Sequence, residues 1–264
     1  PSTADYHCNL GNALNELDRL DEAAASPRQA IALNPDYAKA HNSLANVLLA
    51  QRRSIDAVAS YRMALSIAPD DAETHANLGI ALHELDRLDE AEASYRKALA
   101  LDPDYARAHT SLGTTLQETG RLDEAVACHQ QALALNPDYA EAHANLGNVL
   151  KAMGRLEAAI ASYRKAIALN PDLTGAHTNL GNVLKDQGRL EDAAASHRKA
   201  LAIKPDFANA HSNLGNVLRR LGRLDEAVDS FHKALAIKPD LAEIHNNLGN
   251  ALQDLGRLDE AVTS

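Results

Sequence analysis

A period of 34 residues runs through the whole chain, and it limits the possible folds more than any other feature. Glycine recurs at one place in this period, and only Ala45 breaks the series. The glycines are Gly11, Gly79, Gly113, Gly147, Gly181, Gly215 and Gly249. A repeat of this length packs mainly against its neighbours along the chain, so the period predicts a solenoid.

We predict one array over residues 1–264, with about eight repeats and a truncated last one. The repeats start near residues 4, 38, 72, 106, 140, 174, 208 and 242. The chain begins at Pro1, on the proline grid of the repeat, and it stops at Ser264, partway through a repeat. We therefore expect a fragment of a longer array.

Each repeat contains two helical patterns. In the fifth repeat, Ala140, His143, Leu146 and Leu150 recur at the spacing of an amphipathic helix, which we name helix A. Residues 156–169 show the same spacing and form helix B. Small residues on both helices allow them to pack closely. The predicted fold is all-α, a right-handed superhelical solenoid of antiparallel helix pairs.

Residues at the helix ends give further expectations. Asp138 and Glu141 have the spacing of a capping box, so we expect Asp138 to cap helix A. Gly154 should end helix A, because glycine adopts a left-handed turn at little cost. Pro27 lies in the middle of the first helix B, where it removes a main-chain donor, so we expect a distorted first repeat.

The repeat has a specific resemblance. In the sixth repeat, residues 179–185 read Asn-Leu-Gly-Asn-Val-Leu-Lys and residues 188–193 read Gly-Arg-Leu-Glu-Asp-Ala. With an aromatic and two alanines in helix B and a closing proline, this pattern resembles the tetratricopeptide repeat (TPR). The resemblance implies that helix A lines a concave wall that binds partners. The sequence of this repeat is also similar to the repeat region of O-linked N-acetylglucosamine transferases and related bacterial proteins.

Polar residues form a stripe on helix A, and we name its asparagines the amide ladder. The ladder contains Asn145, Asn148, Asn179, Asn182, Asn213, Asn216, Asn247 and Asn250. An amide both donates and accepts, so such a row can bind the main chain of an extended peptide. The resemblance to the transferases implies the same role. Alternatively, some of these residues bond neighbouring helices and fix the pitch of the superhelix.

Four cations lie one helical turn beyond the ladder: Lys151, Lys185, Arg219 and Arg220. They favour an acidic or phosphorylated peptide, although such charges are often only solvated. Residues 1–132 carry 11 Lys and Arg against 20 Asp and Glu, a net charge of −9, whereas residues 133–264 carry 15 against 16, a net of −1. The overall charge of −10 and the absence of Trp argue against nucleic acid as a partner.

Eight histidines follow the period, one in each helix A, from His7 to His245. Equivalent residues of stacked helices are about 8–10 Å apart, too far to share one zinc ion. We expect half-buried rings with one bonded nitrogen, and hence an array that loses stability in acid. His129 and His197 take the aromatic position of helix B and should be in the core. We predict no metal and no cofactor.

Catalysis is not expected, because nearly every Asp, His and Ser has counterparts in other repeats, and no unique cluster stands out. Cys128 and His129 are adjacent on a helix and point in different directions. The leading interpretation is a non-catalytic scaffold that binds a protein or an extended peptide. The alternatives are the recognition arm of a larger glycosyltransferase and a self-assembling structural solenoid.

No apolar run is long enough to suggest a membrane span, and two cysteines are too few for a disulfide scaffold. These features favour a cytoplasmic protein without a membrane partner. We expect exposed apolar side chains at both ends of the array, because no repeat covers them there. They are Tyr6, Leu10 and Leu14 at one end and Leu248, Leu252 and Leu258 at the other. End-to-end self-association is therefore expected.

Overall fold

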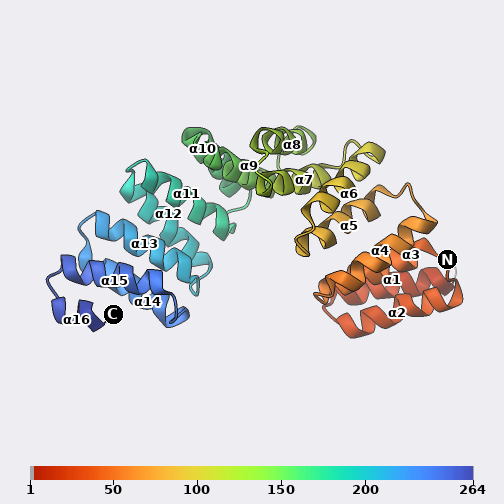
Figure 1. Ribbon diagram of the computed structural model, residues 1–264, viewed down its shortest axis with the longest axis horizontal. Coiled ribbons are helices and arrows are strands. Elements are labelled where there is room, and N and C mark those ends of the chain that lie inside the picture. Colours follow the sequence, from red (N-terminus) through yellow and green to blue (C-terminus); the bar gives the residue numbers. More distant parts are fainter. Residues whose placement is uncertain (1–2, 264) are drawn as a thin grey trace. The chain divides into compact units, whose positions relative to one another are not determined.

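The computed structural model describes residues 3–263, and these form paired α-helices. The A helices are α1 (Thr3–Glu16), α3 (Ala38–Ala50), α5 (Ala72–Glu84), α7 (Ala106–Glu118), α9 (Ala140–Ala152), α11 (Thr174–Asp186), α13 (Ala208–Arg220) and α15 (Ala242–Asp254). The B helices are α2 (Leu20–Leu33), α4 (Ser54–Ile67), α6 (Leu88–Leu101), α8 (Leu122–Leu135), α10 (Leu156–Leu169), α12 (Leu190–Ile203), α14 (Leu224–Ile237) and α16 (Leu258–Thr263). The all-α fold of antiparallel pairs is as predicted (Figure 1).

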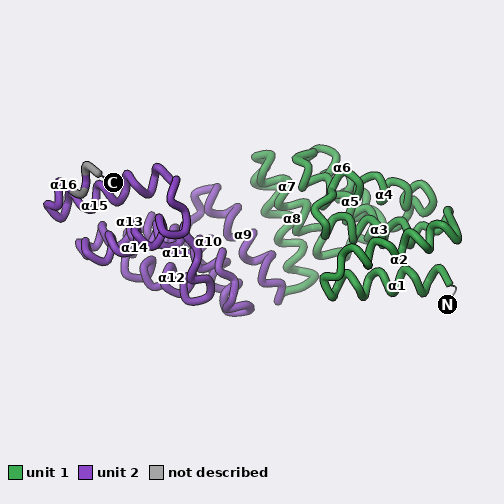
Figure 2. The backbone as a smooth tube through the Cα atoms, turned by 90° about the horizontal axis from the view of Figure 1, so that it is seen from below, with its two compact units in different colours: residues 1–137 green, residues 138–264 purple. Residues whose placement is uncertain are grey.

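The chain divides into two compact units, residues 1–137 and 138–264, which we name unit 1 and unit 2 (Figure 2). Each unit contains four consecutive repeats. The prediction that all repeats form one continuous right-handed superhelix concerns how the units join, and it stays a prediction.

The two helix types have different neighbours within a unit. Each helix A packs against the helix B of its own repeat, and every helix A except the first of each unit also packs against the helix B before it. Successive A helices also contact one another, as α9, α11, α13 and α15 do in unit 2. Among the described residues, successive B helices make no such contact. Because the A helices lie closer together, they line the inner face of each unit.

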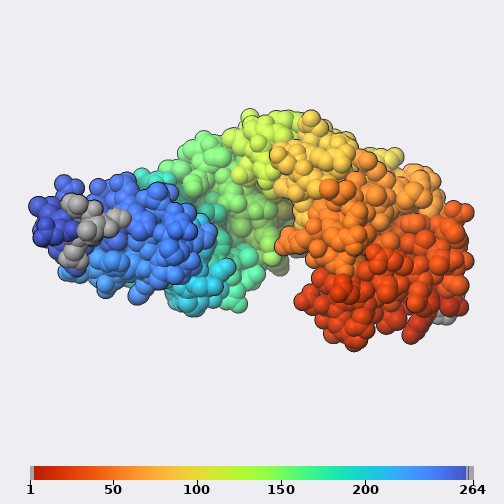
Figure 3. Space-filling model, turned by 60° about the horizontal axis from the view of Figure 1, so that its bottom comes forward, coloured from red at the N-terminus to blue at the C-terminus, as the bar shows by residue number. Residues whose placement is uncertain are grey.

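In repeats 3–7 a ring of helix B packs on the periodic glycine of helix A and fills the centre of the pair; in repeat 2, where Tyr61 is buried, Ala45 takes the place of the glycine. A Cβ placed on Gly147 would lie only 2.7 Å from Cε1 of Tyr163, so a larger residue would displace the ring. The buried rings at this position are Tyr61, Tyr95, His129, Tyr163, His197 and Phe231. Close contact of this kind explains the period of the glycines. Side chains fill the spaces between the ribbons and give each unit a continuous surface (Figure 3).

The expected cap at Asp138 is wrong. The N-cap residue of α9 is Tyr139, one position later, and its side chain makes no capping hydrogen bond. Only repeat 3 has an acidic residue at this later position, and there Asp71 accepts from the backbone N–H groups of Glu73 and Thr74. The periodic histidines of the A helices stabilise the loops before these helices. In six of them, Nε2 donates to the carbonyl oxygen of the proline six residues earlier, at 2.7–2.9 Å.

The turn after helix A is left-handed, as expected for Gly154, which has φ +72°. In repeats 1–3 the same place holds a residue with a side chain, and Asp86 has φ 58°. A left-handed conformation strains such a residue. We expect Asp86→Gly to raise the free energy of unfolding by about 0.5–1 kcal/mol. Urea unfolding would measure this, with Asp86→Ala as the control; no gain over that control would contradict the strain.

Pro27 does not end the first helix B, and the distortion that we expect in this repeat stays a prediction. Helix α2 continues from Leu20 to Leu33, and the Pro27 ring is buried against Gly11, where other repeats place an aromatic ring. The proline thus replaces the ring in packing while removing one hydrogen-bond donor.

The apolar ends are smaller than predicted. Leu14 packs among Ala23, Ala24 and Val47, and it is buried. Leu248 and Leu252 are buried as well, because α15 packs on α14. Tyr6 and Leu258 do remain exposed, each at 60%. Within the described part of the chain, no helix is long and apolar enough to cross a membrane.

Candidate functional site

The amide ladder lies on α9, α11, α13 and α15, the helices that line the inner face of unit 2. All eight of its asparagines are half-buried, so part of each residue is exposed to solvent. The residues between them on the same helices, such as Leu146, Gly147 and Val149, are buried in the core. The ladder is therefore the polar edge of an otherwise apolar helix face.

Two ladder residues bond each other across neighbouring repeats. Nδ2 of Asn179 donates to Oδ1 of Asn148 at 2.9 Å. The hydroxyl of Tyr163, a core ring, donates to the same oxygen at 2.8 Å. The alternative role, in which asparagines bond neighbouring helices, thus holds for this pair. The two contacts occupy the oxygen of Asn148 and leave its N–H groups available.

The next repeats lack this arrangement. His197 takes the place of the tyrosine, and both of its ring nitrogens are buried without a hydrogen-bond partner. Oδ1 of Asn182, the equivalent of Asn148, is also buried without a partner. Burial lowers the pKa of His197 to about 4, with a smaller effect from Lys185. In repeat 7 the ring is Phe231, which has no polar atom.

The four cations differ in what they contact. Nη1 of Arg220 donates to the carbonyl oxygen of Lys185 at 3.0 Å, so it satisfies the C-terminal end of α11. Arg219 lies 3.8 Å from a carboxylate oxygen of Asp254. Lys151 and Lys185 are half-buried beside the ladder, and Nζ of Lys185 lies 3.9 Å from a carboxylate oxygen of Asp186.

Sequence reasoning missed a related site in unit 1. Nη2 of Arg107 donates to Oδ1 of Asn77 at 2.6 Å, and Nδ2 of Asn77 donates to Oδ1 of Asn46 at 3.4 Å. The hydroxyl of Tyr61 donates to the same oxygen at 2.6 Å. These four residues border a pocket of about 400 Å³.

A sequence signal for this site existed. Asn46 and Asn77 lie on the two 34-residue grids of the ladder, but in neighbouring repeats, where the other ladder position is interrupted by Ser43 and by Ile80 respectively. Only the packing of successive A helices brings them together.

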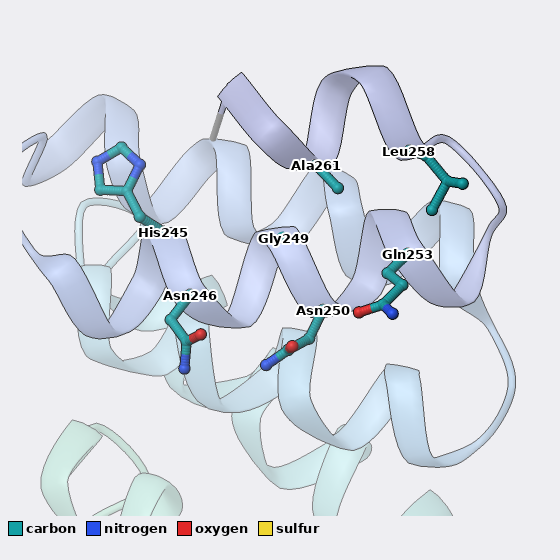
Figure 4. Close-up of a pocket in the computed structure, with 7 residues that line it drawn as sticks. All are labelled: His245, Asn246, Gly249, Asn250, Gln253, Leu258 and Ala261. Atoms are coloured by element: carbon teal, nitrogen blue, oxygen red, sulfur yellow. The ribbon is translucent and has the colours of Figure 1, made fainter.

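A further pocket, of about 550 Å³, lies at the last repeat. Its lining includes the ladder residue Asn250, which projects from α15 together with Asn246 and Gln253, while Leu258 and Ala261 come from α16 (Figure 4). The ladder therefore reaches a hollow beside Gly249 at the end of unit 2.

Two observations within residues 3–263 concern metal binding and nucleophilic catalysis. No group of three His, Cys, Asp or Glu side chains within this range could hold a metal ion. Burial raises the pKa of the Cys128 thiol, which disfavours the thiolate, the form that acts as a nucleophile.

Stacked antiparallel helix pairs with a polar inner face define a helical repeat scaffold. A family model described as TPR repeat matches residues 11–51, 81–120, 115–154, 147–188, 181–222 and 215–256, and one described as tetratricopeptide repeat matches residues 60–93. These matches cover most of the sequence. The chain belongs to the tetratricopeptide repeat family.

Solved structures agree with this assignment. The crystal structure of YrrB, described as a TPR protein with an unusual peptide-binding site, is 25% identical, with a TM-score of 0.57 over 74% of this chain and 97% of YrrB. MamA is 30% identical, with a TM-score of 0.57 over 63% of this chain and 97% of MamA. The APC/C hetero-tetramer Cut9–Hcn1 is 17% identical, with a TM-score of 0.76 over 93% of this chain and 52% of that one, which shows the fold alone. A search of curated protein sequences finds no match.

Proposed function

We propose that the inner face of unit 2 binds an extended segment of a partner protein through the amide ladder. The observation that carries this proposal is a row of half-buried amides on contacting A helices, with the oxygen of Asn148 already occupied and its N–H groups available. Main-chain carbonyl oxygens of an extended segment would accept from such groups. The described peptide-binding site of YrrB supports the same class of ligand.

The partner segment is acidic in this proposal. Lys151 and Lys185 lie beside the ladder; within residues 3–263 Lys151 forms no ion pair, and Lys185 forms one with Asp186, at 3.9 Å. Charge-assisted hydrogen bonds to carboxylates are stronger than those between neutral groups. Acidic side chains placed alternately along the segment would reach these lysines while its main chain follows the ladder.

The test starts from a random peptide library displayed on phage and selected on the wild-type protein. The triple variant Asn145→Ala, Asn213→Ala and Asn247→Ala removes three amides of one ladder grid for which the structure shows no bond to another repeat. We expect it to weaken the selected peptide about tenfold to hundredfold, because each net hydrogen bond contributes about 0.5–1.5 kcal/mol. Fluorescence anisotropy would measure the loss.

The matched control changes the outer helices. Lys165, Lys199 and Lys233 are exposed on α10, α12 and α14 and occupy a single grid. Their triple replacement by alanine removes three positive charges but no ladder residue. If the control weakens binding as much as the asparagine variant, charge alone attracts the peptide and the proposed site is wrong.

A second function uses the same surface. As the recognition arm of a larger glycosyltransferase, the ladder would hold the substrate polypeptide by its main chain and so tolerate varied side chains. The Asn-Leu-Gly-Asn sequence at residues 179–182, which contains two ladder residues, favours this role. Both functions require the same contact.

A further inference from the structure

The residue buried beneath the second ladder asparagine of a repeat, Asn148, Asn182 or Asn216, differs from repeat to repeat. The rings of Tyr163, His197 and Phe231 occupy the same place, packed on Gly147, Gly181 and Gly215 respectively. All three rings are completely buried. Only the tyrosine has a hydroxyl that extends past the glycine to the amide above it.

The Tyr163 hydroxyl determines whether Asn148 donates to a ligand or accepts from it. A carbonyl oxygen has two lone pairs, and Oδ1 of Asn148 uses both, for Tyr163 and for Asn179. Asn148 can therefore only donate to a ligand. Its own oxygen could turn outward only if both internal bonds were broken.

The hydrogen bonds of the asparagines in unit 1 run in the same direction. An arginine can only donate, so the bond from Arg107 requires the oxygen of Asn77 to face it. The nitrogen of Asn77 must then face Asn46, whose oxygen also accepts from Tyr61. The same polarity thus appears in both repeats where tyrosine lies beneath an asparagine.

Repeat 6 has no such constraint. Neither nitrogen of His197 bonds to Asn182, and the oxygen of Asn182 has no partner. A buried oxygen without a partner costs free energy, and turning the amide toward a ligand N–H removes this cost. The Asn182 amide is therefore free to accept as well as to donate.

We propose that the residue beneath the second ladder asparagine of a repeat sets the polarity of that position, so that Tyr163 makes Asn148 a donor to ligand carbonyls, whereas His197 leaves Asn182 to accept a ligand main-chain N–H. Tyr163 and His197 are positioning residues, since they act through the asparagine above. This inference rests on the proposed function for its ligand.

The binding test uses esters of the peptide selected on the wild-type protein. Each peptide bond is replaced in turn by an ester, which removes one N–H. The ester facing Asn182 is the one whose penalty disappears in Asn182→Ala. In the wild type we expect it to weaken binding about five- to tenfold. In His197→Tyr the new hydroxyl holds the oxygen of Asn182, and the penalty should fall to about twofold or less.

His197→Phe is the control, because it keeps a ring and adds no hydroxyl; it should retain the wild-type penalty. Identical ester profiles in His197→Tyr and His197→Phe would overturn the inference. A purely structural effect of the substitution would weaken all esters equally and would not remove the penalty at one position.

A second measurement needs no ligand. Side-chain amide NMR signals of Asn182 should move toward those of Asn148 in His197→Tyr and stay unchanged in His197→Phe. If the library yields no peptide, the proposed function fails, while these spectra still decide the polarity. Unchanged Asn182 signals in His197→Tyr would refute the inference even if peptides bind.

Discussion

The free energy of unfolding should fall by several kcal/mol as the pH decreases from about 6.5 to about 4, because two core histidines must gain protons. His129 and His197 are fully buried, and burial lowers the pKa of each from 6.5 to about 4. Between about pH 6.5 and pH 4, these two histidines bind protons in the unfolded chain but stay neutral in the folded chain. Stability is therefore complete above about pH 6.5 and is lost toward pH 4. At about 1.4 kcal/mol per pH unit, each ring contributes about 3 kcal/mol.

The double variant His129→Phe and His197→Phe isolates this effect. Phe231 shows that a phenyl ring fits the position. Carboxylates also lose their ion pairs in acid, so urea unfolding of both proteins should be compared between pH 7 and pH 4. We expect the variant to lose markedly less stability than the wild type. Parallel curves would show that these two histidines do not control the acid response.

Tyr163→Ala should destabilise unit 2 by about 3–5 kcal/mol, because it leaves a cavity at the centre of repeat 5. The ring is fully buried and packs on Gly147. Tyr163→Phe keeps the packing and loses only the hydroxyl bond to Asn148, so it should cost about 1 kcal/mol. The midpoint of urea unfolding would measure both variants.

Repeat proteins can unfold in parts, so hydrogen exchange should accompany the urea series. Amides of α9 and α10 should lose protection first in Tyr163→Ala. If both substitutions cost the same, the hydroxyl network rather than ring packing would stabilise the repeat.

Sequence periodicity was enough to predict the helix pairs and the inner-face stripe. The 34-residue grids locate Gly147, Asn145 and Asn148 in equivalent places of each repeat, and packing then follows from the period. The left-handed turn at Gly154 was predictable for the same reason, since only glycine adopts it without strain.

Other features depend on distances between helices, which a period does not contain. The bond of Asn148 to Asn179 requires the spacing of α9 and α11, and the Arg107–Asn77–Asn46 chain spans three repeats. The cap at Asp138 was wrong because a shift of one residue moves the side chain away from the first helical turn. Leu248 was expected to be exposed, since the sequence does not show how well α14 covers α15.

The most direct test of the account is a crystal structure of the wild-type protein with the selected peptide. We predict an extended peptide along α9, α11, α13 and α15, with a main-chain carbonyl oxygen of the peptide within about 3 Å of Nδ2 of Asn148. A peptide bound on the outer B helices, or one that makes no main-chain hydrogen bond to the amide ladder, would contradict the central claim.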